Sequence, residues 1–160
     1  METSSIYNSD MTILQQIIDV APKTVKKYLP KDIREAYASV LYSCAAVDKE
    51  VGDEELVLLD NTLLSMAVFS GCDEAEYVAM AEENSRNYPS CEILQESFNY
   101  ISKNLWPQLF YYCCKVLLAK GIMSDKGKKM LDKVIELSDT GGVAAKRIME
   151  VALLPNVKNE

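Results

Sequence analysis

The stretch Ser43–Asp60, SCAAVDKEVGDEELVLLD, decides the fold because it joins two helix-forming segments through a short polar bend. Apolar residues before and after the bend recur at helical spacing, whereas a strand would show an alternation with a period of two. The bend, Asp48–Gly52, is called here the first elbow. We expect Asp53 to cap the following helix, and Glu54 and Glu55 suit its first turn, where the helix dipole favours carboxylates.

The same helical spacing extends through almost the whole chain. It predicts an all-α, single-domain bundle of about eight helices. The expected segments are a helix capped by Asp10, a helical turn over 25–29, a helix begun by Pro30 with its apolar residues at 33–44, helices over 53–67, 73–84, 91–102 and 107–117, a helix with apolar residues at 130–135 that ends before 140–142, and a last helix over 143–154.

Composition excludes several classes of function. The chain has 160 residues and a net charge of −7, which argues against nucleic acid as the main partner. It has no histidine, so triads of the Ser-His-Asp or Cys-His kind cannot form. Its five cysteines contain no CxxC pair, and we expect them to be buried, reduced residues in a cytoplasmic protein. No apolar run approaches the roughly 18 residues of a membrane span, and no signal peptide is evident.

A second copy of the elbow lies 72 residues further on. The stretch Lys115–Asp132, KVLLAKGIMSDKGKKMLD, has the same order of apolar helix, short bend, acidic cap and apolar helix. Its bend, Lys120–Ser124, is the second elbow. Three identities align the copies: Asp53 with Asp125, Leu59 with Leu131, and Asp60 with Asp132. We therefore expect two pseudo-repeated helix–elbow–helix units inside one bundle, since a solenoid usually has at least three repeats.

This order of residues resembles the tellurite-resistance TerB-like family, whose pattern is Ala-Asp-Gly-x-Ile/Val-Ser/x-x-x-Glu between two helices, given twice. The first copy reads VDKEVGDEE over 47–55 and keeps Asp48 and Glu55, but has a lysine where glycine is usual. The second reads AKGIMSDKG over 119–127 and keeps Gly121 and Ser124. There Lys120 replaces the aspartate and Gly127 the glutamate.

The resemblance covers about residues 33–154. It divides the single domain, residues 1–160, into a TerB-like core over 30–154 and an N-terminal helical extension over 1–29. It implies an all-helical bundle, a link to tellurite resistance or general chemical stress, and divalent-metal association through acidic surface residues. It supplies no catalytic mechanism.

Both elbows are candidate binding sites. Hard cations such as Ca²⁺ or Mg²⁺ prefer clustered oxygen ligands, so the candidate metal ligands are Asp48, Glu50, Asp53 and Glu54. The alternative is a solvated turn followed by an ordinary acidic first turn of a helix. Around the second elbow the chain is basic and could bind an anion, or present a solvated lysine face. The residues concerned are Lys120, Lys126, Lys128, Lys129 and Lys133.

These observations lead to one leading hypothesis and two alternatives. The leading hypothesis is a non-enzymatic interaction or scaffold protein of a cytoplasmic stress response, with a protein partner or self-association, and with no nucleic-acid partner or integral membrane segment. The first alternative is a divalent-cation-binding module, and a divalent cation is the one cofactor considered. An enzyme that uses paired carboxylates is the second alternative, although no set of residues in the sequence converges to support it.

Overall fold

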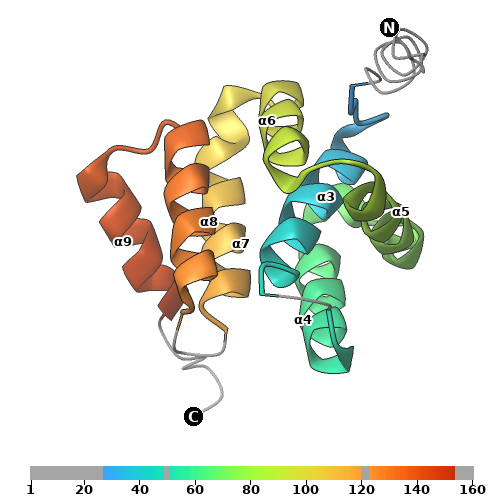
Figure 1. The fold of residues 1–160 in the computed structure, drawn as a ribbon, viewed down its shortest axis with the longest axis horizontal. Coiled ribbons are helices and arrows are strands. Elements are labelled where there is room, and N and C mark those ends of the chain that lie inside the picture. Colours follow the sequence, from blue (N-terminus) through green and yellow to red (C-terminus); the bar gives the residue numbers. More distant parts are fainter. Residues whose placement is uncertain (1–26, 49–50, 120–122, 154–160) are drawn as a thin grey trace, which may run out of the picture.

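The computed structural model describes residues 27–48, 51–119 and 123–153, and every regular element in these segments is a helix. Seven α-helices and two short 3₁₀ turns follow one another along the described chain (Figure 1). The α-helices are α3 (Ile33–Ala45), α4 (Asp53–Leu64), α5 (Glu74–Asn87), α6 (Ser90–Tyr100), α7 (Trp106–Leu117), α8 (Asp125–Leu137) and α9 (Gly142–Leu153), and the 3₁₀ turns are η1 (Ala67–Phe69) and η2 (Lys103–Leu105). The predicted all-α class is confirmed for these residues. None of the described helices combines the length and the apolar character that crossing a bilayer requires.

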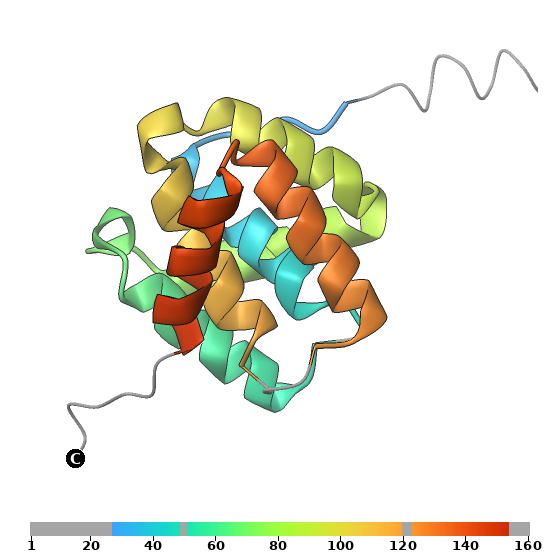
Figure 2. The same cartoon turned by 90° about the vertical axis from the view of Figure 1, so that its left-hand side faces the viewer.

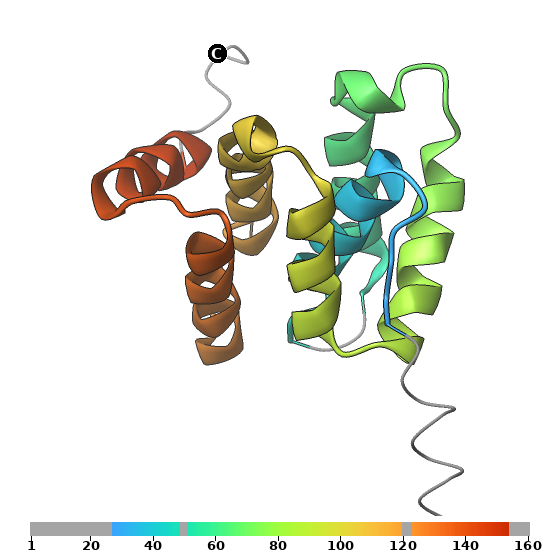
Figure 3. The same cartoon turned by 90° about the horizontal axis from the view of Figure 1, so that it is seen from above.

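Helix α3 lies at the centre of the fold. All of its residues from Glu35 to Cys44 are buried, and α4, α5, α6 and α7 pack around it (Figures 1 and 3). A helix that is covered on every side needs apolar or small side chains all round. Here Ala36 and Ala38, both fully buried, let the neighbouring helices approach closely.

Helix α7 forms the second half of the core. It packs against α3 on one side and against α8 and α9 on the other, and Figure 2 shows α9 in front of it. Leu109, Phe110 and Cys113 on α7 are fully buried. The contact between α3 and α7 therefore holds together the two helix–elbow–helix segments.

The chain before α3 differs from the prediction. Residues 27–30 have no regular secondary structure, so the helical turn predicted over 25–29 is wrong over its described part, 27–29. Pro30 does not begin a helix, because α3 starts at Ile33 and is capped by Asp32, whose Oδ1 accepts a hydrogen bond from Glu35 N at 2.9 Å. Helical backbone is disfavoured for a residue that precedes proline, as Leu29 does here. This accounts for the absence of a helix over 27–30. The predicted helix capped by Asp10 lies outside the described residues.

Helix α4 begins and ends differently from the prediction. Gly52, not Asp53, is the N-cap residue, and the carboxylate of Glu55 accepts a hydrogen bond from Gly52 N at 3.1 Å. At its other end α4 stops at Leu64, three residues before the predicted end at 67, and Leu64 is 56% exposed. The chain turns there, and η1 places Phe69 in the core.

Both predicted interruptions of the helical pattern are present. Helix α3 ends at Ala45 and α4 begins at Asp53, while α7 ends at Leu117 and α8 begins at Asp125. The two elbows lie at the same end of the molecule, as the described ends of their helices show in Figure 1. Residues 49–50 and 120–122 of the elbows, and the N-terminal residues 1–26 on which the count of about eight helices depends, lie outside the described chain.

Candidate functional site

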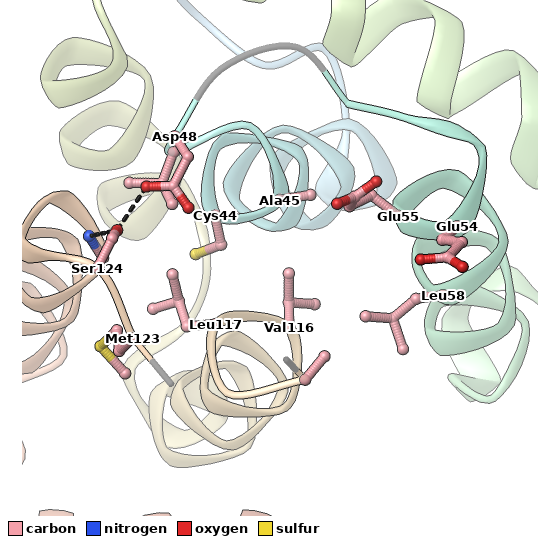
Figure 4. Close-up of a pocket in the computed structure, with 13 residues that line it drawn as sticks. Cys44, Ala45, Asp48, Glu54, Glu55, Leu58, Val116, Leu117, Met123 and Ser124 are labelled. Carbon is pink, nitrogen blue, oxygen red and sulfur yellow. Dashed lines mark hydrogen bonds between the residues drawn. The ribbon is translucent and has the colours of Figure 1, made fainter. Parts of the chain in front are cut away.

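A cavity of about 260 Å³ lies where the ends of four helices meet beside the two elbows. Its apolar lining comes from Cys44 of α3, Leu58 of α4, Val116 and Leu117 of α7, and Met123 just before α8 (Figure 4). These side chains offer no strong hydrogen-bond donors or acceptors. The interior of the cavity therefore favours the aliphatic part of a ligand over a bare ion.

The described charged side chains that line this cavity are acidic. Asp48 lies on one side, and Glu54 and Glu55 lie on the other, with apolar side chains between them (Figure 4). Outside the gaps at 49–50 and 120–122 and the chain ends, no lysine or arginine is among the lining residues. A concave apolar surface concentrates the field of the charges around it, so this cavity attracts cationic groups.

A hydrogen bond between the two elbows fixes one side of the cavity. The hydroxyl of Ser124 donates to Oδ1 of Asp48, and Ser124 Oγ also accepts from the backbone N–H of Gly127 at 3.0 Å (Figure 4). Ser124 is thus the N-cap of α8 and the link to the end of α3. The sequence singled out both elbows, but it did not predict that a capping serine would join them.

The opposite side of the cavity is built by the first turn of α4. Glu55 accepts from Gly52 N, and this hydrogen bond ties the Glu55 side chain to the start of the helix. Glu54 lines the cavity, whereas its neighbour Asp53 is exposed and does not line it. Successive residues of a helix point about 100° apart, which explains why adjacent carboxylates face different surroundings.

The four predicted metal ligands are placed as follows. Asp48 and Glu54 line the cavity, Asp53 does not, and Glu50 lies outside the described residues. Within the described part of the chain, no three His, Cys, Asp or Glu side chains are grouped so that they could hold one metal ion. Calcium takes six to eight oxygen ligands, and the carboxylates seen here stand on opposite sides of an apolar cavity (Figure 4). The metal site stays a prediction, since one of its four residues is not described.

Of the buried cysteines, one lines the cavity and two lie on α7. All five described cysteines are free, and Cys44, Cys113 and Cys114 are buried. Burial raises the pKa of the Cys113 thiol well above its usual range and that of Cys114 to about 12, and the neighbouring Cys44 thiol adds to both effects. A thiol in this state is a poor nucleophile. The expectation that all cysteines are buried is wrong for Cys91, which is exposed at the start of α6.

The predicted basic residues belong to a different surface. Lys126, Lys129 and Lys133 line a separate cavity of about 290 Å³ between α6 and α8. Lys128 is exposed and lines neither cavity, and Lys120 lies outside the described residues. The elbows of opposite charge do lie close together, but the described contact between them is the bond from Ser124 to Asp48.

Part of the cavity could not be found from the sequence. The helical spacing places Val116 and Leu117 in a predicted helix over 107–117 and Leu58 in one over 53–67, but it does not indicate that the three side chains meet at a cavity. A cavity is the space that remains between packed helices, and no residue pattern encodes it. The acidic composition of the first elbow was the one usable signal.

The fold and the site define an all-helical protein with an acidic cavity at the junction of two helix–elbow–helix segments. In comparisons with known proteins, no family model, no curated protein and no solved structure matches this chain.

Proposed function

We propose that this protein is a non-enzymatic interaction protein whose acidic cavity binds a basic side chain of a protein partner. The observation that carries the proposal is the combination of an apolar lining with three carboxylates, Asp48, Glu54 and Glu55, and with no basic lining residue in the described part of the chain. Lysine and arginine bury their aliphatic stems on apolar surface while the charged head stays at a polar edge. The cavity offers both surroundings within about 260 Å³.

The rest of the proposal depends on the sequence. The chain has no histidine, and burial raises the pKa of the Cys113 and Cys114 thiols, which supports a binding role over nucleophilic catalysis. The resemblance to the TerB-like family supports a place in a cytoplasmic stress response related to tellurite resistance. The pseudo-repeat is part of the same proposal, and it is supported by the alignment of Asp53 with Asp125 and by the position of both elbows at one end of the bundle (Figure 1).

A pair of charge reversals on adjacent residues tests the binding role. Glu54→Lys places a cation in the cavity lining, and Asp53→Lys makes the same charge change on the exposed neighbour. The probe is a short fluorescein-labelled peptide in which one arginine is flanked by leucines, and binding to the full chain is followed by fluorescence anisotropy. We expect Glu54→Lys to weaken binding about tenfold and Asp53→Lys to change it less than about twofold.

Other outcomes would contradict the proposal. Equal losses in the two variants would mean that the peptide responds to net charge alone. Absence of binding by the wild-type chain would also reject the cavity as a site for basic segments. Circular dichroism of both variants checks that they keep the helical fold.

The divalent-cation alternative has its own test. Calorimetric titration of the full chain with Ca²⁺, Mg²⁺, Mn²⁺ and Zn²⁺ would detect binding at Asp48, Glu50, Asp53 and Glu54. No heat, together with no rise in melting temperature at millimolar metal, would remove this alternative. Heat that Asp53→Lys abolishes, while peptide binding persists, would favour the alternative.

A further inference from the structure

The cavity of about 290 Å³ that Lys126, Lys129 and Lys133 line forms one end of a longer groove, which runs between α8 and the junction of α5 with α6. Its apolar lining is Val47, Leu94 and Met130. An adjoining cavity of about 390 Å³ shares Val47, Ser90 and Met130 with it. The groove therefore has a continuous apolar base at the edge where α3 ends.

Three lysines form one wall of this groove. Lys126, Lys129 and Lys133 follow one another at i, i+3 and i+7, which places them on one face of α8 over a length of about 10 Å. Lys133 also contacts the exposed Glu136, with 3.7 Å between Nζ and Oε1. A surface pair of this kind contributes little and is easily exchanged for another carboxylate.

Two carboxylates of α6 are held by partners outside the groove. On α6, Glu92 accepts a hydrogen bond from Tyr28 N at 2.7 Å, and Glu96 forms an ion pair with Lys27 at 3.2 Å. Neither lines the groove, and among residues 27–48, 51–119 and 123–153 no acidic side chain lines either of its two cavities. Although the protein has a net charge of −7, the charged side chains that line this groove are all lysines among the residues that the structure describes.

We propose that this groove is a second interaction site, which binds an acidic amphipathic helix of a protein partner. Carboxylates at i, i+3 and i+7 of such a helix match the row of three lysines, and its apolar face covers Val47, Leu94 and Met130. The site is separate from the acidic cavity in charge and in lining residues, apart from Val47. The protein then joins a basic partner at one surface to an acidic partner at another.

A designed helical peptide tests this proposal on the full chain. The probe carries glutamates at i, i+3 and i+7, leucines on the adjoining face and a fluorescein label. The variant Lys126→Glu/Lys129→Glu reverses charges in the groove, and the control Lys128→Glu/Lys146→Glu makes the same net change at exposed positions outside it. We expect the groove variant to bind about tenfold more weakly and the control to stay within about twofold of wild type.

A second peptide isolates the apolar contribution without any change to the protein. Replacing its leucines by serine keeps the charge and should reduce binding, whereas unchanged binding would mean a charge contact without a groove. Equal losses in the two lysine variants, or no binding by wild type, would overturn the proposal. If the full chain sedimented with phosphatidylserine-containing vesicles and did not bind the peptide, the lysines would be a membrane-binding surface. That result would also overturn the proposal. The outcome is independent of the arginine-peptide experiment, since that peptide is directed to the other cavity.

Discussion

The buried carboxylate of Glu35 should be one of the most sensitive positions for stability. It is 7% exposed and accepts three hydrogen bonds: from Lys31 N at 2.9 Å, from Tyr28 Oη at 3.1 Å and from Asn84 Nδ2 at 2.9 Å. These donors belong to the extended segment before α3 and to α5. The carboxylate therefore fastens two neighbouring parts of the chain to the central helix.

The substitution Glu35→Ala would leave these donors without their acceptor. An unsatisfied buried donor costs about 1–3 kcal/mol, and a bond to a charged group contributes at the upper end of the usual range. Tyr28 and Asn84 each keep Ser39 Oγ as a second acceptor, at 3.0 and 3.4 Å. The variant therefore loses only part of the free energy that three fully unsatisfied donors would cost. We expect the free energy of unfolding to fall by about 3–5 kcal/mol, a large share of the stability of an ordinary domain.

Urea unfolding followed by circular dichroism measures this change directly. Glu35→Gln, which keeps one acceptor and the shape, should lose about 1–2 kcal/mol and provides a measurement if the alanine variant does not fold. Glu82→Ala, an exposed residue paired with Arg86, is the control and should stay within about 0.5 kcal/mol of wild type. A loss of less than about 1 kcal/mol for Glu35→Ala would refute the reasoning, because the donors would then find other partners at little cost.

Two further predictions follow from neighbouring contacts. Burial, with a contribution from Glu35, raises the pKa of Tyr28 from 10.0 to about 12. As pH rises, the unfolded chain therefore loses this proton at a lower pH than the folded chain does. The stability that this difference contributes is complete below pH 10 and is lost as pH rises towards 12. Alkaline urea titrations should show a shallower decline for Tyr28→Phe than for wild type, and parallel declines would contradict the assignment. Ser124→Ala removes the cap of Gly127 N and the bond to Asp48, and should lower the unfolding free energy by about 1–2 kcal/mol, whereas the exposed Ser70→Ala should not. Equal stability of these two serine variants would show that the link between the elbows contributes nothing.

Helix type and helix breaks could be predicted from local patterns. The spacing of apolar residues identified the helices of the described chain, and the helix predicted over 73–84 is α5, which Asp73 caps through Ala75 N. The predicted helix boundaries were wrong where a contact with another residue determines the backbone conformation. Glu55 completes a capping arrangement with Gly52, which displaces Asp53 by one position, and Tyr28 is buried among α3, α5 and α6, in place of the predicted helical turn.

The sequence by itself determined the helical class, the two elbows and the opposite charges of the segments around them, because helix periodicity and charge are local properties of the chain. Tertiary structure alone decided which charged residues share a surface. Glu54 lines a cavity and Asp53 does not, and Lys129 lines a groove while Lys128 faces solvent. The physical reason is that a helix turns each successive residue by about 100°, so the packing of its neighbours selects which side chains meet.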